Sequence, residues 1–167
     1  YFLPNEYISY VDLIRDGMEL MIVGHEFGHY FSGHLNNTLK NALSEIGRQE
    51  SMTQAHQDEY VADFWGALLA VQALRDKGFD PALSYIGVDL FFSAMILCNR
   101  FSSLASGIKE EHFEEDECET HPTFRNRQLF LRRAILNVKG INEFQEQIKA
   151  LYCFYDKCIE AVWSEIS

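Results

Sequence analysis

The hydrophobic positions along this chain recur with the spacing of helices. Apolar residues three and four apart run through most of its 167 residues, whereas alternation of apolar and polar residues is nearly absent. Ten glycines and three prolines leave room for long uninterrupted segments. Spacing of three and four residues is typical of helices, and alternation is typical of strands. The pattern therefore predicts a mainly α fold with little or no β structure.

Capping residues and glycines divide the pattern into successive helices. Ser51 or Thr53 is suited to the start of one long helix and Gly78 to its end, and Asp80 followed by Pro81 is suited to the start of the next. The helix that begins at Pro81 is apolar on most sides, so we expect it at the centre of the core. The expected elements are an opening segment at 4–15, a helix at about 18–35, a short helix to about residue 48, and helices at about 53–77, 81–101, 122–138 and 142–164.

One stretch, 102–120, breaks the helical pattern. Its positions 109–119 hold seven acidic residues and one lysine, and such a charged run favours a solvated loop. The functional alternatives are a lid, an attractor for basic peptides, and capture of a metal by Cys118 or His112. No stretch resembles a linker, so we expect a single domain over 1–167. Because the chain begins with a tyrosine rather than methionine, we allow for further native sequence before it.

Composition narrows the class of protein. A hydrophobic content of 47% is typical of a globular chain, and a net charge of −11 argues against binding to nucleic acid. Unbroken apolar runs such as 64–71 are shorter than the roughly 18–20 residues that cross a bilayer, so no transmembrane segment is expected. The four cysteines form no C-x-x-C pair. They are expected to be reduced, mostly buried thiols of a cytoplasmic protein.

The chemistry of the chain centres on His25-Glu26-Phe27-Gly28-His29 within the helix at 18–35. Side chains four residues apart lie on one helix face, so His25 and His29 can bind one metal ion. Glu26 would lie beside a metal-bound water and act as its general base. This H-E-x-x-H pattern predicts a zinc site, and a catalytic zinc site needs a third protein ligand.

Glu59 is the best candidate for the third ligand. It lies on the next long helix, and Asp63 follows one turn later, where its carboxylate can hold the free ring N–H of a ligand histidine. Ala62 is small enough to let another helix approach closely. His34 is a weaker candidate, because its spacing fits neither one helix face nor the metzincin pattern. Asp58 is a further alternative as the third ligand. The structural alternative is that the acidic residues at the start of this helix only complement the helix dipole and bind no metal.

Three blocks of sequence resemble a known family of peptidases. Together they resemble the gluzincin zinc metallopeptidases of the Ste24/HtpX type, in which H-E-x-x-H is followed by an E-x-E-A-D helix and an H-P-x-x-x-x-R segment. The resemblance covers about residues 18–130. The blocks in this chain are His25-Glu26-x-x-His29, Glu59-x-x-Ala62-Asp63 and Thr120-His121-Pro122-x-x-x-x-Arg127.

The resemblance implies a zincin-like helical fold, Zn²⁺ as cofactor, Glu59 as the third ligand and Asp63 as the residue that orients His25. This chain departs from the family in three respects. Val61 stands where the family has its second glutamate, the membrane helices of many relatives are missing, and no strand that would pair with an extended substrate is evident.

His121 and Arg127 are expected to support the same site. His121 precedes a proline at a helix start, where its ring can donate to the oxyanion of a tetrahedral intermediate. Arg127, two turns later, is expected to pair with Glu26, Asp63 or the acidic stretch. The structural alternatives are a capping histidine and an arginine that packs between helices.

The sequence thus predicts a zinc-dependent endopeptidase that acts on a peptide or protein substrate. Glu26 is the expected general base and His121 the expected oxyanion donor, with Tyr30 and Tyr60 as alternative donors. The alternative functions are a catalytically silent zinc-binding interaction module, a helical interaction protein without metal, and a regulatory metalloprotease of the ImmA/IrrE type. That last group shares H-E-x-x-H and E-x-x-A, but has asparagine where Asp63 stands and lacks the His-Pro-Arg block.

Overall fold

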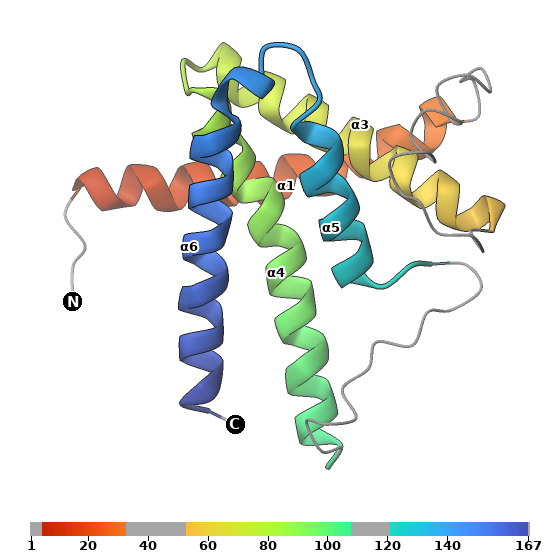
Figure 1. The fold of residues 1–167 in the computed structure, drawn as a ribbon, viewed down its shortest axis with the longest axis vertical. Coiled ribbons are helices and arrows are strands. Elements are labelled where there is room, and N and C mark those ends of the chain that lie inside the picture. Colours follow the sequence, from red (N-terminus) through yellow and green to blue (C-terminus); the bar gives the residue numbers. More distant parts are fainter. Residues whose placement is uncertain (1–4, 33–52, 108–120, 167) are drawn as a thin grey trace.

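The computed structural model describes residues 5–32, 53–107 and 121–166, and its regular elements are helices (Figure 1). No strand occurs within these ranges, which confirms the predicted mainly α fold. The elements are α1 (Asn5–Ser32), α3 (Gln54–Asp76), α4 (Pro81–Ala105), α5 (Phe124–Ile135), the 3₁₀ turn η2 (Asn142–Phe144) and α6 (Gln145–Ser164).

Local chemistry sets the helix ends much as the sequence predicts. Thr53 caps α3 by accepting a hydrogen bond from the His56 backbone N–H, and Asp80 caps α4 by accepting from Leu83 N–H at 2.9 Å. Gly78, which follows α3, has φ of +96°, a conformation that glycine adopts without strain.

Three predicted boundaries are wrong. The opening segment and the motif helix form one continuous helix, α1, and α4 extends four residues past 101. The helix expected to open at His121-Pro122 begins instead at Phe124, because Thr123 Oγ1 caps it by accepting from Asn126 N–H at 3.1 Å. The short helix before residue 48, His34, and the acidic stretch with His112 and Cys118 lie outside the described residues.

Helix α4 is the centre of the fold. It contacts α1, α3, α5 and α6, and α6 lies alongside it in Figure 1. Its buried side chains include Tyr85, Val88 and Phe92, which pack with Leu131 and Ile135 of α5 in the main core cluster. The prediction that this helix lies at the centre of the core is confirmed.

Glycines let α1 cross its two neighbours at backbone distance. A Cβ added to Gly17 would lie 2.9 Å from the Cα of Gly87 in α4, and one added to Gly24 would lie 2.9 Å from the Cα of Gly66 in α3. Such distances leave no room for any side chain. The crossings therefore fix where the middle and the end of α1 lie on the rest of the fold.

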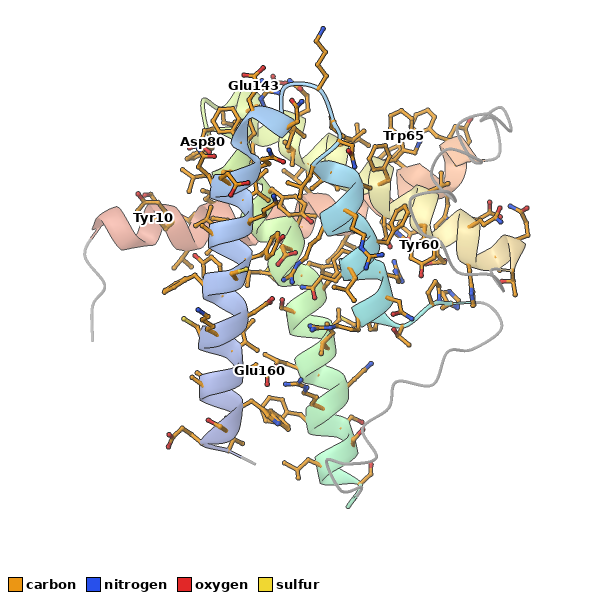
Figure 2. The ribbon with its side chains drawn as sticks, in the orientation of Figure 1. Tyr10, Tyr60, Trp65, Asp80, Glu143 and Glu160 are labelled. Carbon is orange, nitrogen blue, oxygen red and sulfur yellow. The ribbon has the colours of Figure 1, made fainter. Side chains whose placement is uncertain are left out.

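A buried polar network ties α5 to α4 and α6. Arg132 donates to both carboxylate oxygens of Asp89, at 2.8 and 2.7 Å, and to both oxygens of Asp156, at 2.7 and 2.8 Å. Its guanidinium also lies over the ring of Tyr152, 4.3 Å from the centroid. Nearer the ends of the helices, Glu160 of α6 binds Arg100 of α4 at 2.9 Å (Figure 2).

The structure bears on two expectations that were drawn from composition, one about membrane spans and one about the cysteines. Helix α4 is long and apolar enough to cross a membrane by length and composition, but other helices bury more than half of its most apolar window, so it is weak evidence for a span. Cys98, Cys153 and Cys158 are free and exposed, so the expectation of mostly buried thiols is wrong for these three. They lie on outward faces of α4 and α6, and Cys118 lies outside the described residues.

Candidate metal centre

The crossing of α1 and α3 brings the motif histidines to Glu59. A Cβ added to Gly28 would lie 2.6 Å from both the Cα and the carbonyl oxygen of Ala62. The two helices therefore touch backbone to backbone one turn from Glu59, which confirms the prediction that Ala62 permits a close approach. The rings of His25 and His29, on this part of α1, both lie beside Glu59 of α3.

Three donor atoms converge at this crossing. The Nε2 atoms of His25 and His29 are 3.0 Å apart. Glu59 Oε1 is 3.3 Å from His29 Nε2, and Glu59 Oε2 is 3.7 Å from His25 Nε2. One donor atom from each of the three residues lies within 4.8 Å of the others, so the group can hold a metal ion. The structure thus brings the three predicted ligands together.

The spacing of these donors fits a tetrahedral site. Ligand atoms bound to zinc at about 2.0–2.2 Å in tetrahedral geometry are about 3.4 Å from one another. The two Nε2 atoms are 3.0 Å apart and Glu59 Oε1 is 3.3 Å from His29 Nε2, both near that value, and the second oxygen, Oε2, is 3.7 Å from His25 Nε2. The residues present therefore fit a bound cation.

Asp63 holds His25 in the orientation that metal binding requires. Asp63 Oδ1 lies 2.9 Å from His25 Nδ1, and the Asp63 side chain is fully buried. A carboxylate at this distance places the ring proton on Nδ1 and leaves the lone pair of Nε2 facing His29 and Glu59. The predicted position of Asp63 behind the first histidine is therefore observed.

Arg127 balances the charge of the two buried carboxylates. Its Nε and Nη2 donate to the two oxygens of Asp63 at 2.8 and 2.7 Å, and its Nη1 lies 3.1 Å from Glu59 Oε2. Burial lowers the pKa of Arg127, but the bonds to Asp63 and the charge of Glu59 outweigh that effect, so its pKa is raised. The guanidinium therefore stays charged at any physiological pH.

The contacts of Arg127 refine the sequence-based expectation. Asp63 is one of its predicted partners, whereas Glu26 is exposed on the outer face of α1. The ion pair with Glu59 was not predicted, because it depends on how α5 lies against α3. The guanidinium is also packed between the rings of Phe92 and Phe124, 5.7 and 5.5 Å from its carbon.

The two carboxylate oxygens of Glu59 consequently face different neighbours. Oε2 faces Arg127, while Oε1 faces His29 at 3.3 Å and His121 Nε2 at 3.5 Å. Glu59 is only 6% exposed, whereas the His121 side chain is 59% exposed. His121 and Arg127, the two predicted polar side chains of the last block, thus both lie beside Glu59.

The remaining predicted residues differ in how far they are exposed. Glu26 is exposed and has exposed apolar neighbours on the same face of α1. Tyr30 is 68% exposed, whereas Tyr60 is buried against Phe130, with ring centroids 4.5 Å apart (Figure 2). Tyr60 therefore belongs to a small core cluster rather than to an open site. The exposed apolar neighbours of Glu26 on α1 are Ile22, Val23 and Phe27.

Comparison of the chain with protein-family models, with curated proteins and with solved structures gave no match.

Proposed function

We propose that this chain is a zinc-dependent endopeptidase in which His25, His29 and Glu59 bind the metal and Glu26 is the general base. The observation that carries the proposal is that one donor atom from each of His25, His29 and Glu59 lies within 4.8 Å of the others, while Glu26 of the same H-E-x-x-H motif is exposed. A purely structural site has no use for a carboxylate next to its open side.

The donor set favours zinc over the other common cations. Two imidazole nitrogens and one carboxylate oxygen suit Zn²⁺, whereas Ca²⁺ and Mg²⁺ take sites of six or more oxygens. Three protein ligands leave one position of a tetrahedral ion to water or substrate, which is the arrangement of catalytic rather than structural zinc. When bound, zinc would lower the pKa of a coordinated water and polarise a peptide carbonyl.

The protein groups then have distinct tasks. The Glu26 carboxylate accepts a proton from the attacking water and returns it to the nitrogen of the leaving amine. Asp63 keeps the proton of His25 on Nδ1, so that Nε2 remains a ligand. Arg127 compensates the charge of Glu59 and Asp63 within the buried side of the site. A ring N–H of the exposed His121, which lies 3.5 Å from Glu59 Oε1, would donate to a developing oxyanion.

The surface next to Glu26 supports a peptide as substrate. Val23 and Phe27 are both 54% exposed on the outer face of α1, and apolar groups at that place offer contacts for the side chains of an extended chain. The net charge of −11 favours substrates with basic or neutral sequences over acidic ones.

The test is cleavage of a diverse peptide library by the zinc-loaded protein and by its Glu26→Gln variant, with zinc content measured for both. We expect the wild type to cleave, and the variant to bind zinc without cleaving. Glu19→Gln is the matched control, because Glu19 lies on the same helix with its side chain 68% exposed; it should cleave like the wild type. Equal cleavage by Glu26→Gln, or none by zinc-loaded wild type, contradicts the proposal.

A further inference from the structure

A pocket of about 80 Å³ lies between α4, α5 and α6, and its lining residues are separate from those of the metal centre. Each of the three helices contributes polar side chains to it, among them Glu160 of α6, which Figure 2 shows beside α4. Its apolar wall consists of Ile96, Leu97 and Ile159. Because about 10–15 Å³ accommodates one water-sized group, the pocket can take a molecule of about six heavy atoms.

A buried amide forms one end of the pocket. Gln128 is only 1% exposed, and its Nε2 donates to Ser93 Oγ at 2.9 Å and to the Asp89 carbonyl oxygen at 3.2 Å. A carbonyl oxygen only accepts hydrogen bonds, which fixes the nitrogen of the amide on that side. Gln128 Oε1 is buried and has no hydrogen-bond partner in the part of the chain that the structure describes, although buried oxygens normally accept a hydrogen bond. A ligand with a donor group would satisfy it.

Asp156 adds negative charge at the same end. Arg132, one turn after Gln128 on α5, donates to the two oxygens of Asp156 at 2.7 and 2.8 Å. A carboxylate has about four lone-pair sites, so Asp156 can accept from a ligand as well as from Arg132. A positively charged donor is favoured beside a carboxylate, which makes an ammonium group the donor that suits this end.

The direction of the helices places the arginines of the pocket at its other end. Arg132 of α5 bonds Asp89 of α4, whereas Gln128 of α5 bonds Ser93 of α4, so the two helices run antiparallel. Arg125 lies about one turn before Gln128. It therefore lies toward the later residues of α4, away from the buried amide.

Arg100 is the charged residue of α4 at this other end. Its Nη1 donates to Glu160 at 2.9 Å, and its guanidinium lies over the ring of Trp163, 5.5 Å from the centroid. A guanidinium has five N–H donors, so Arg100 can bind a second carboxylate together with Arg125. Two of the three charged lining residues here are cations, which favours an anionic group.

We propose that this pocket binds a small zwitterion, a free α-amino acid with a short aliphatic side chain. The ammonium group would meet Gln128 Oε1 and Asp156, the carboxylate would meet the two arginines, and the side chain would pack on the apolar wall. Alanine, with six heavy atoms, has the size that the pocket can take. The site goes beyond the proposed function, because it involves neither the metal ligands nor Glu26.

The experiment titrates the full chain with L-alanine in a calorimeter and follows Tm. Propionate and ethylamine are the comparison probes, because each carries only one of the two charges. We expect alanine to release or absorb heat and to raise Tm, and each comparison probe to bind at least about tenfold more weakly, since it loses the hydrogen bonds of one charged group. Neither heat nor a rise of Tm with about 10 mM alanine, or equal affinity for the three probes, overturns the proposal.

Two variants locate the site. Arg125→Gln removes a guanidinium at an exposed position, and Gln128→Leu removes the buried acceptor with little change of volume. Each should weaken alanine binding at least about tenfold. Arg133→Gln is the matched control, because Arg133 is exposed on the same helix and does not line the pocket; it should bind alanine like the wild type.

Circular dichroism of each variant verifies that the helices are retained. Equal alanine binding by the wild type and Arg125→Gln, which leaves the core untouched, would place the ligand elsewhere and refute the assignment. These titrations contain no zinc and measure no cleavage, so their failure and the failure of the proposed function are separate results.

Discussion

Gly28 lies at the point where the helix crossing and the metal centre depend on each other. In Gly28→Ala, the new Cβ would lie 2.6 Å from the Cα and the carbonyl oxygen of Ala62. Carbon atoms in contact prefer about 3.5–4.0 Å. Because both contacted atoms belong to the backbone, a change of rotamer cannot relieve the clash, and α1 must move away from α3 by about 1 Å.

The cost of that movement can be estimated. Overpacking a tight interface typically costs about 1–3 kcal/mol, and a backbone clash belongs at the upper end of this range. Alanine is favoured over glycine in a helix by about 1 kcal/mol, which offsets part of the loss. We expect the free energy of unfolding to fall by about 2 kcal/mol, and Tm to fall by about 4–8 °C for a chain of this size.

The same movement should weaken metal binding. Metal–ligand distances tolerate deviations of about 0.2 Å, so a shift of about 1 Å between the histidines and Glu59 is expected to lower zinc affinity at least about tenfold. Thermal denaturation followed by circular dichroism and zinc competition with a chelator measure the two effects on the same samples.

Two further variants sharpen this test. Glu19→Ala introduces alanine at an exposed position of the same helix, and should change neither quantity appreciably. Ala62→Gly combined with Gly28→Ala should not restore either one, because the clash involves the backbone of residue 62 and not its side chain. Unchanged stability and zinc affinity in Gly28→Ala, or rescue by Ala62→Gly, would refute the argument from the crossing.

Three other predictions concern the charges and the metal. Arg127→Met leaves two buried carboxylates uncompensated, and urea denaturation should show a loss of about 3–5 kcal/mol; an unchanged midpoint would refute the role of this ion pair. Asp63→Asn removes the charge behind His25 and should lower zinc affinity about 10–100-fold in a chelator competition, unlike Asp58→Asn, and equal effects of the two would contradict it. Zinc at about 1,000 times its Kd should stabilise the fold by about 4 kcal/mol, so a chelator should lower the Tm of zinc-loaded wild type but not that of His25→Ala.

The local features of the fold could be predicted from the sequence because short-range chemistry determines them. The caps at Thr53 and Asp80 and the helix end near Gly78 follow from residues that act on their own neighbours, and the central place of α4 follows from its apolar side chains. The boundary near His121 was wrong because the sequence offers two adjacent start signals, the proline and Thr123, and only the geometry shows which one caps the helix.

The candidate site was predictable in part for the same reason. His25 and His29 lie together through helix spacing alone, and Asp63 was placed behind them by its position one turn from Glu59. The ion pair between Arg127 and Glu59 depends on the packing of α5 against α3, which no spacing within either helix encodes.

The glycine crossings were the signal that the sequence-based argument overlooked. Gly17, Gly24 and Gly28 follow one another on α1 at intervals of about two turns and one turn, and meet Gly87, Gly66 and Ala62. Glycine is unfavourable in helix interiors by about 1 kcal/mol relative to alanine, so its repetition inside an otherwise good helix already indicates close contact. Arg132 and its two aspartates were also missed, because their chain separation hides the network that joins α4, α5 and α6.

Calorimetric titration of the metal-free protein with Zn²⁺ tests the central claim most directly. For the wild type we predict one zinc ion per chain. For Glu26→Gln we predict the same stoichiometry and similar affinity, because Glu26 is exposed and outside the donor group. For Glu59→Gln, which keeps the shape of the side chain, we predict a loss of affinity of about 100-fold or more. Absence of zinc binding by the wild type, or equal binding by Glu59→Gln, would contradict the account.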